Sequence, residues 1–184
     1  MNRLFNPFRY IAGLKSLVMG AIFIVAASLM LYGGGMIQDS YLHIGYADAT
    51  LLRVLLFQVI YWLSPALLLY LSGVLLSKSR IRIVDILGTT AFAQLILLLL
   101  IAPMLLPAVQ SDVAKLFALL QSGSQEFTGL MALCIYALWS LLCIILYYIW
   151  NYNAFAVSCN VRGFKAIVIF IVVQLLVTIL PLLI

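Results

Sequence analysis

The 184 residues of this chain are 67% hydrophobic and 8% charged, with a mean hydropathy of +1.25. A water-soluble globular chain has roughly 45–50% apolar and about 25% charged residues, so the solvent of this fold must be lipid. The formal net charge is +5, but the cations lie at the ends of apolar runs, which excludes a nucleic-acid surface and makes the lipid bilayer the expected partner.

The apolar stretches are each near the 20 or so residues that cross a hydrocarbon core of about 30 Å. The elements expected in chain order are an interfacial segment at 3–13, spans at about 16–37, 52–76 and 83–106, an interfacial segment at 109–121, and spans at about 127–150 and 164–184. We therefore predict an all-α polytopic integral membrane protein, one membrane domain over 1–184 with five transmembrane helices and short interfacial helices.

Glycine and proline residues are expected to shape the first two spans. Gly33, Gly34 and Gly35 should loosen the first helix near its exit. Pro65 lies near the middle of the second span, where it removes a backbone hydrogen bond and should kink the helix.

The distribution of cations predicts the orientation, because Lys and Arg gather in cytoplasmic loops. Eight of the ten lie on one side: Arg3, Arg9, Lys15, Lys78, Arg80, Arg82, Arg162 and Lys165. The other side has only Arg53 and Lys115, together with four of the five acids: Asp39, Asp48, Asp112 and Glu126. This arrangement predicts a cytoplasmic N-terminus and a C-terminus on the far side.

Asp85 begins the third span, directly after the basic loop. Asp85, Gly88 and Thr89 share one helical face, so they form a candidate corner at the cytoplasmic surface. One interpretation is structural: Asp85 caps the helix, interacts with its dipole and pairs with a nearby arginine. The other is a partner-binding corner, completed by residues that precede the last span: Asn151, Asn153, Asn160 and Arg162.

A second set of polar residues lies inside the predicted spans: Gln58, Thr90, Gln94 and Gln174. Hydrogen bonds between helices, worth roughly 1 kcal/mol or less each, explain such residues in a structural protein. If copies of the chain assemble, the same residues could instead line a shared polar path.

Other functional motifs are absent from the sequence. It contains no G-x-S-x-G, H-E-x-x-H or Walker motif and no paired intramembrane acids, so we expect no enzyme and no cofactor. His43 lies near Asp39 and Asp48, but their spacing matches no metal-ligand pattern. Cys134, Cys143 and Cys159 support neither a disulfide framework nor a zinc site.

Three stretches together resemble the Yip family (Ypt/Rab-interacting proteins), in its bacterial branch. They are Asn6–Phe8 with Ile11–Gly13, Arg80 with Arg82–Thr90, and Tyr152–Lys165. The resemblance covers nearly the whole chain and implies a five-span fold, with Asp85 and Gly88 matching the family's Asp-x-x-Gly corner. Eukaryotic members bind prenylated small GTPases through a cytoplasmic N-terminal domain. Here only about fifteen residues precede the first span, so that partnership is not carried over.

The leading hypothesis is a non-enzymatic scaffold of the cell membrane, a bacterial inner membrane, that binds other membrane proteins or further copies of itself through its cytoplasmic loops. The alternative is a small transporter or channel subunit that forms a pathway by oligomerisation.

Overall fold

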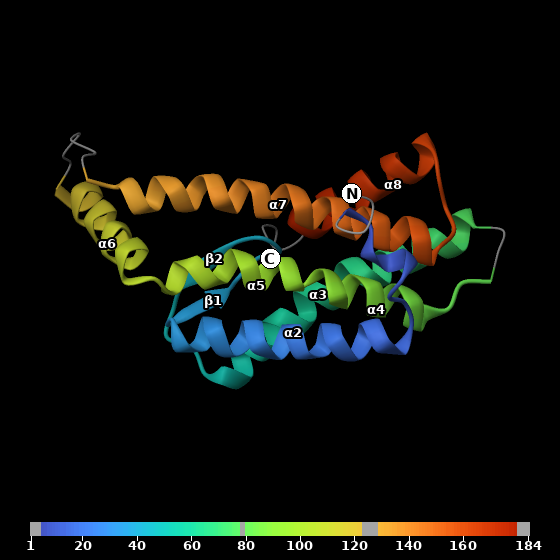
Figure 1. Ribbon diagram of the computed structural model, residues 1–184, viewed down its shortest axis with the longest axis horizontal. Helices are drawn as coiled ribbons and strands as arrows, with labels where there is room; N and C mark the ends of the chain where they lie inside the picture. Colours follow the sequence, from blue (N-terminus) through green and yellow to red (C-terminus); the bar gives the residue numbers. More distant parts are fainter. Residues whose placement is uncertain (1–4, 78–79, 123–128, 180–184) are drawn as a thin grey trace.

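The computed structural model describes residues 5–77, 80–122 and 129–179. Its long helices lie side by side in an elongated bundle (Figure 1). The described elements, in chain order, are η1 (Pro7–Arg9), α2 (Leu14–Gly33), β1 (Met36–Gln38), β2 (Ile44–Tyr46), α3 (Leu51–Leu76), α4 (Ile83–Ala93), α5 (Leu95–Ile101), η2 (Ala102–Leu105), α6 (Pro107–Ser122), α7 (Met131–Ser158) and α8 (Phe164–Ile179).

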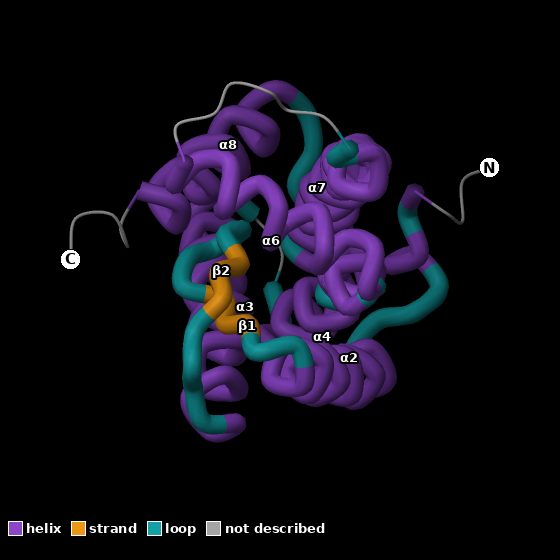
Figure 2. Tube along the Cα trace, turned by 90° about the vertical axis from the view of Figure 1, so that its left-hand side faces the viewer, coloured by secondary structure: helices purple, strands orange, loops and turns teal. Residues whose placement is uncertain are grey.

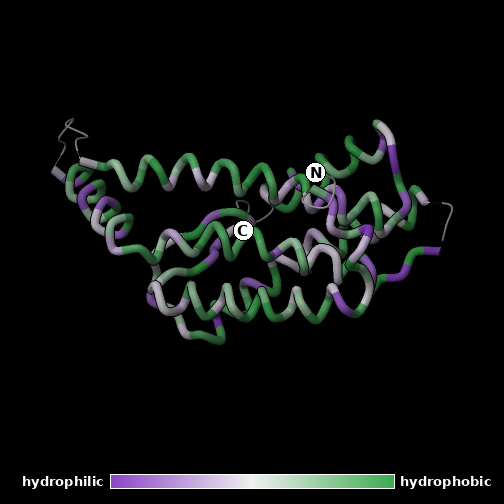
Figure 3. The backbone as a smooth tube through the Cα atoms, in the orientation of Figure 1, coloured by the Kyte–Doolittle hydropathy of each residue, from purple (hydrophilic) through white to green (hydrophobic). Residues whose placement is uncertain are grey.

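The prediction of an all-α polytopic membrane protein is confirmed. Four helical stretches are long and apolar enough to cross a membrane: α2, α3, the run Ile83–Leu105 and α7. The fifth predicted span corresponds to α8, an apolar helix of 16 described residues. Residues 180–184 of that prediction lie outside the described part of the chain. Hydrophobic residues run along the long helices, and hydrophilic ones gather toward the ends of the bundle (Figure 3).

The two ends of the bundle differ as the cation pattern predicts. The end of α3, the start of α4 and the α7–α8 connection lie at one end, with the N-terminal segment in the same half of the bundle; we call this the inner end (Figure 1). The base of the β1–β2 hairpin and α6 lie at the other, outer end. Arg3, Lys78 and Glu126 of the charge pattern fall outside the described residues.

Several predicted boundaries were wrong. We expected the fourth span to end at Trp150, but α7 continues to Ser158, so the stretch from Asn151 is helical rather than loop. The helix contains neither glycine nor proline, and its polar inner turns therefore stay helical. The third span is interrupted at Gln94, whose N–H donates to the carbonyl of Ala91, a tighter turn than in an α-helix.

The β1–β2 hairpin was not predicted. The first span was expected to reach Ile37, but α2 ends at Gly33, and Gly35 takes φ +62°, which turns the chain into β1. Met36 pairs with Tyr46 in an antiparallel register. The hairpin enters the bundle from the outer end and lies beside α3 (Figures 1 and 2). The residues of β1 are buried, whereas those of β2 are half-buried or exposed.

Helices α2 and α4 pack closely because small residues face each other. A Cβ on Gly20 of α2 would overlap Ala91 and the backbone of Phe92. A Cβ on Gly88 of α4 would lie 2.5 Å from Ser16 Oγ and 2.6 Å from the Gly13 carbonyl oxygen. Small residues at such crossings allow backbones to approach and gain van der Waals contact, which drives helix association in lipid.

The N-terminal segment packs into the bundle, which differs from the interfacial anchor expected at 3–13. Phe8, in η1, is buried and lies edge-on against Phe92 and Trp150, with ring centroids 6.1 and 5.8 Å away. Phe92 and Trp150 stack on each other at 5.8 Å. Phe5 and Tyr10 remain exposed, so only one aromatic residue of this segment enters the core.

Helix α6 contains the predicted interfacial segment 109–121 and is joined to α7 by a carboxylate. Asp112 Oδ2 accepts hydrogen bonds from the N–H groups of Ala132 (2.9 Å) and Leu133 (3.3 Å), the second and third residues of α7. Lys115 Nζ donates to Asp112 Oδ1 at 3.1 Å. Asp112 therefore supplies, from another helix, the cap that the first turn of α7 needs.

This cap predicts a loss of stability in acid. The hydrogen bond from Lys115 and those from the α7 backbone lower the pKa of Asp112, although burial opposes the shift. A carboxyl whose pKa is lower in the folded state stabilises the fold above its unfolded pKa, about 3.9, and loses this effect as the pH falls through the folded value. We expect Asp112→Ala to lower the unfolding temperature at pH 7, and the gap to wild type to close in strong acid. Thermal unfolding of the detergent-solubilised protein across pH 2–7 would measure it; a gap that persists in acid would contradict the assignment.

Candidate functional site

The predicted cytoplasmic corner is held together by hydrogen bonds between α4 and α7. The carbonyl oxygen of Asp85 accepts from Thr89 Oγ1 (2.8 Å) and from Ser158 Oγ (3.2 Å). Thr89 and Ser158 also lie 2.9 Å apart, hydroxyl to hydroxyl. Gly88, on the same face, has no side chain and so allows α2 to lie close to α4. The corner therefore fixes how three helices meet at the inner end.

Asp85 fulfils only part of its predicted structural role. It lies in the first turn of α4, where a negative charge is favourable near the positive end of the helix dipole. Its side chain does not cap the helix, since the N-cap is Arg82 and no side-chain cap bond forms there. Among the described residues, the two ion pairs are His43–Asp39 and Lys115–Asp112, so the expected arginine partner is not found in that part of the chain.

Asn151 and Asn153 are also used inside the fold. Asn153 Nδ2 donates to the carbonyl oxygen of Phe5 at 2.8 Å, and its Oδ1 accepts from Asn6 Nδ2 at 3.4 Å. Asn151 is buried, and its Nδ2 donates to the carbonyl oxygen of Tyr147 one turn earlier. These two asparagines hold the N-terminal segment and the inner half of α7 in place. Most of their hydrogen-bonding groups are therefore not available to a partner.

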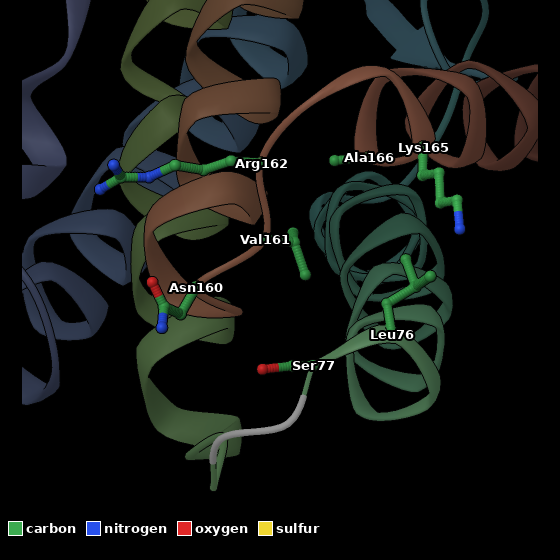
Figure 4. Close-up of a pocket in the computed structure, with 7 residues that line it drawn as sticks. All are labelled: Leu76, Ser77, Asn160, Val161, Arg162, Lys165 and Ala166. Atoms are coloured by element: carbon green, nitrogen blue, oxygen red, sulfur yellow. The ribbon is translucent and has the colours of Figure 1, made fainter.

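Asn160 and Arg162 are placed differently, at an open pocket of about 500 Å³ between the ends of α3 and α7 and the start of α8. Its lining is Leu76, Ser77, Asn160, Val161, Arg162, Lys165 and Ala166. Asn160 has φ +50°, and this left-handed conformation ends the helix. Arg162 and Lys165 are exposed and point in opposite directions from the pocket (Figure 4).

The second predicted set of polar residues lies inside the single chain, since all four side chains are buried. Gln94 Nε2 donates to the Tyr147 hydroxyl at 3.3 Å, which joins the third span to α7. Thr90 Oγ1 accepts from Trp62 Nε1 at 3.2 Å, which joins the third span to α3. These are the interhelical bonds expected of structural residues. A path shared between copies does not follow from this placement, because none of the four faces outward.

Interhelical hydrogen bonds explain Gln58 and Gln174 less completely. Nε2 of Gln58 and both amide atoms of Gln174 are buried and make no hydrogen bond with a described residue. The Tyr41 hydroxyl, at the tip of the hairpin, is in the same state. It lies near the Tyr147 hydroxyl and the Gln174 amide, but neither contact reaches hydrogen-bond geometry. Buried polar groups without partners are costly and mark places where a further polar molecule can bind.

Sequence reasoning missed the partners that connect the predicted residues. Ser158 lay in the predicted connection between the fourth and fifth spans, and neither Tyr147 nor Tyr41 was singled out from the sequence. A signal for Tyr147 was available, since Asn151 follows it by one helical turn and marks that face of α7 as polar. No such signal existed for Tyr41, which depends on the hairpin.

The chain matches no known family model, no curated protein and no solved structure. Among the described residues, no group of three His, Cys, Asp or Glu side chains is arranged to hold a metal ion. The site must therefore be interpreted from its own geometry.

Proposed function

We propose that this chain is a non-enzymatic membrane protein, a Yip-like scaffold of the bacterial inner membrane, that binds an acidic partner through its inner end. The observation that supports this most is the charge of that end. Its described cations are all exposed: Arg9, Lys15, Arg80, Arg82, Arg162 and Lys165. Among the described residues, the one acid of the same end, Asp85, is half-buried.

The rigidity of the inner end supports the same proposal. The bonds of Asp85, Thr89 and Ser158, with those of Asn153, fix three chain segments against one another: α4, α7 and the N-terminal segment. A fixed surface loses less conformational entropy on binding than a flexible one. The exposed Asn160, Arg162 and Lys165 around the 500 Å³ pocket are then presented in a set geometry.

Crosslinking in native membranes tests this proposal. A photoreactive phenylalanine analogue at Phe164, which is 79% exposed beside Arg162, should yield a defined adduct. Adding Arg162→Glu and Lys165→Glu should lower the yield about tenfold or more, because each basic residue near an anionic surface contributes about 1 kcal/mol.

The matched control is Arg53→Glu, an exposed arginine at the outer end. Like each of the two substitutions at the pocket, it replaces a cation by an anion, but it does not touch the pocket, and we expect it to leave the yield unchanged. No adduct at Phe164, or equal losses from both changes, would overturn the proposal.

A second candidate, a transporter or channel subunit, is favoured by one observation. Gln94 donates to the Tyr147 hydroxyl, and the Tyr41 hydroxyl lies near both Tyr147 and Gln174. The Gln174 amide has no partner among the described residues. A path of this kind would run within one chain and past the hairpin rather than between copies.

A further inference from the structure

The pocket at the inner end combines apolar walls with a cationic rim. Leu76, Val161 and Ala166 supply its apolar surface, and the last two are buried. Arg162 and Lys165 are exposed at its edge and extend to opposite sides of it (Figure 4). No acidic residue of the described chain lines the pocket. Such a lining matches a molecule that has an anionic head and an apolar body.

The two cations of the rim are not neutralised within the described fold. The described ion pairs are His43–Asp39 and Lys115–Asp112, and neither includes Arg162 or Lys165. The Asp85 carboxylate lies beside the start of α2, since a Cβ on Gly13 would be 3.4 Å from its Oδ1. Arginine and lysine side chains have many rotamers, so both cations can turn towards an anion held between them.

The walls of the pocket continue into apolar surface on two neighbouring helices. Leu75 precedes the lining residue Leu76 in α3 and is 88% exposed. Ile167 follows the lining residue Ala166 in α8 and is also exposed, as is Phe164 at the start of that helix. Helices α3 and α8 pack against each other. Acyl chains attached to an anionic head can therefore lie along these side chains, whereas an acidic peptide would leave them uncovered. This favours a lipid as the occupant.

We propose that this pocket binds an anionic phospholipid, with the phosphate between Arg162 and Lys165 and the acyl chains along α3 and α8. The inference rests on the proposed function, because it names the acidic partner of the inner end. Basic pockets between transmembrane helices on the cytoplasmic side suit anionic lipid headgroups. Asn160 also lines the pocket, and its amide can donate a further hydrogen bond to a phosphate oxygen.

Native mass spectrometry of the purified chain in detergent tests lipid binding. The probes are phosphatidylglycerol and phosphatidylcholine with the same acyl chains, which differ in the net charge of the headgroup. We expect phosphatidylglycerol to bind about tenfold more tightly or better, and Arg162→Ala with Lys165→Ala to remove most of this preference. Equal binding of the two lipids by the wild-type chain would overturn the proposal.

The matched control removes two other cations from the same end. Arg9 and Lys15 are exposed and do not line the pocket, so Arg9→Ala with Lys15→Ala should leave the preference unchanged. Equal losses from the two double variants would mean a diffuse attraction to the whole inner end and would contradict a defined site.

Asn160→Asp tests the rim without removing a cation. Aspartate tolerates the left-handed backbone of this position (φ +50°) as asparagine does, so the fold should be kept. The added negative charge should weaken phosphatidylglycerol binding about threefold or more. If this variant binds the lipid as the wild type does, the phosphate does not lie at this rim and the assignment is wrong.

Two further outcomes separate this inference from the proposed function. If excess inorganic phosphate displaces the bound phosphatidylglycerol, the pocket takes a free anion and the lipid is not its ligand. If the wild type shows no lipid preference, but the crosslinker at Phe164 still gives a protein adduct that depends on Arg162 and Lys165, the acidic partner is a protein. The proposed function then stands and the lipid inference fails, whereas the loss of both signals rejects both.

Discussion

Gly20→Ala should destabilise the bundle by about 1–3 kcal/mol, although it adds a single methyl group. The new Cβ would overlap both the Cβ and the backbone carbonyl carbon of Ala91. Backbone atoms of a packed helix cannot rotate away, so α2 and α4 must separate along their crossing. Gly88→Ala should act in the same direction, since its Cβ would lie 2.6 Å from the Gly13 carbonyl oxygen. The measurement is the free energy of unfolding in a detergent mixture of increasing denaturing strength.

Gly33→Ala is the matched control for this prediction. Gly33 lies in the last turn of the same helix, and a Cβ there would meet nothing within 4 Å. Alanine is favoured over glycine in a helix, so this change should leave the stability unchanged or raise it by up to about 1 kcal/mol. If all three variants are equally stable, the α2–α4 crossing is not the close contact described above.

The sequence predicted the long elements well, because a membrane simplifies the problem. A hydrocarbon core requires apolar stretches of a set length, and α3 begins and ends within one residue of its predicted bounds, 52–76. The predicted corner was also a real meeting point, since Asp85 and Thr89 contact the inner end of α7. The spacing of Asp85, Gly88 and Thr89 was enough to place them on one helix face, although the residues of α7 that they contact were not known.

The hairpin could not be predicted in the same way. Its strands are three residues each, too short for an alternating pattern to be visible. Gly33, Gly34 and Gly35 showed that the helix weakens, but whether the chain then leaves the membrane or turns back into it depends on space between α2, α3 and α7. That space is set by tertiary packing. Tyr41 could be recognised as a site residue only after this turn was known.

The burial of Phe8, at the inner end of the bundle, also could not be predicted from the sequence. Aromatic and basic residues alternate in the N-terminal segment, a pattern typical of an anchor at the headgroups. The pattern does not distinguish Phe5, which stays exposed, from Phe8, which enters the core. What decides between them is the space beside the stacked rings of Phe92 and Trp150, which lie on two helices that are far apart in sequence.

Phe8→Ala should therefore cost about 3 kcal/mol, the lower end of what removal of a buried phenylalanine costs. Truncation leaves a cavity beside the stacked Phe92 and Trp150 rings and removes two edge-to-face ring contacts. Part of the penalty remains in any apolar solvent, because it comes from lost packing rather than from exposure to water. The N-terminal segment should loosen, and protease added at the inner face should cleave it faster. Unfolding free energy and cleavage rate are the two measurements.

Phe5→Ala separates this effect from a general loss of aromatic surface. The Phe5 ring is 44% exposed, while its carbonyl oxygen still accepts the hydrogen bond from Asn153 in the variant. A change at such an exposed position should stay within about 0.5 kcal/mol of wild type. If Phe5→Ala and Phe8→Ala cost the same, the segment is held by its backbone bond to α7 rather than by the Phe8 ring. The inner end would then owe its rigidity to Asn153, and Asn153→Ala would become the variant that releases it.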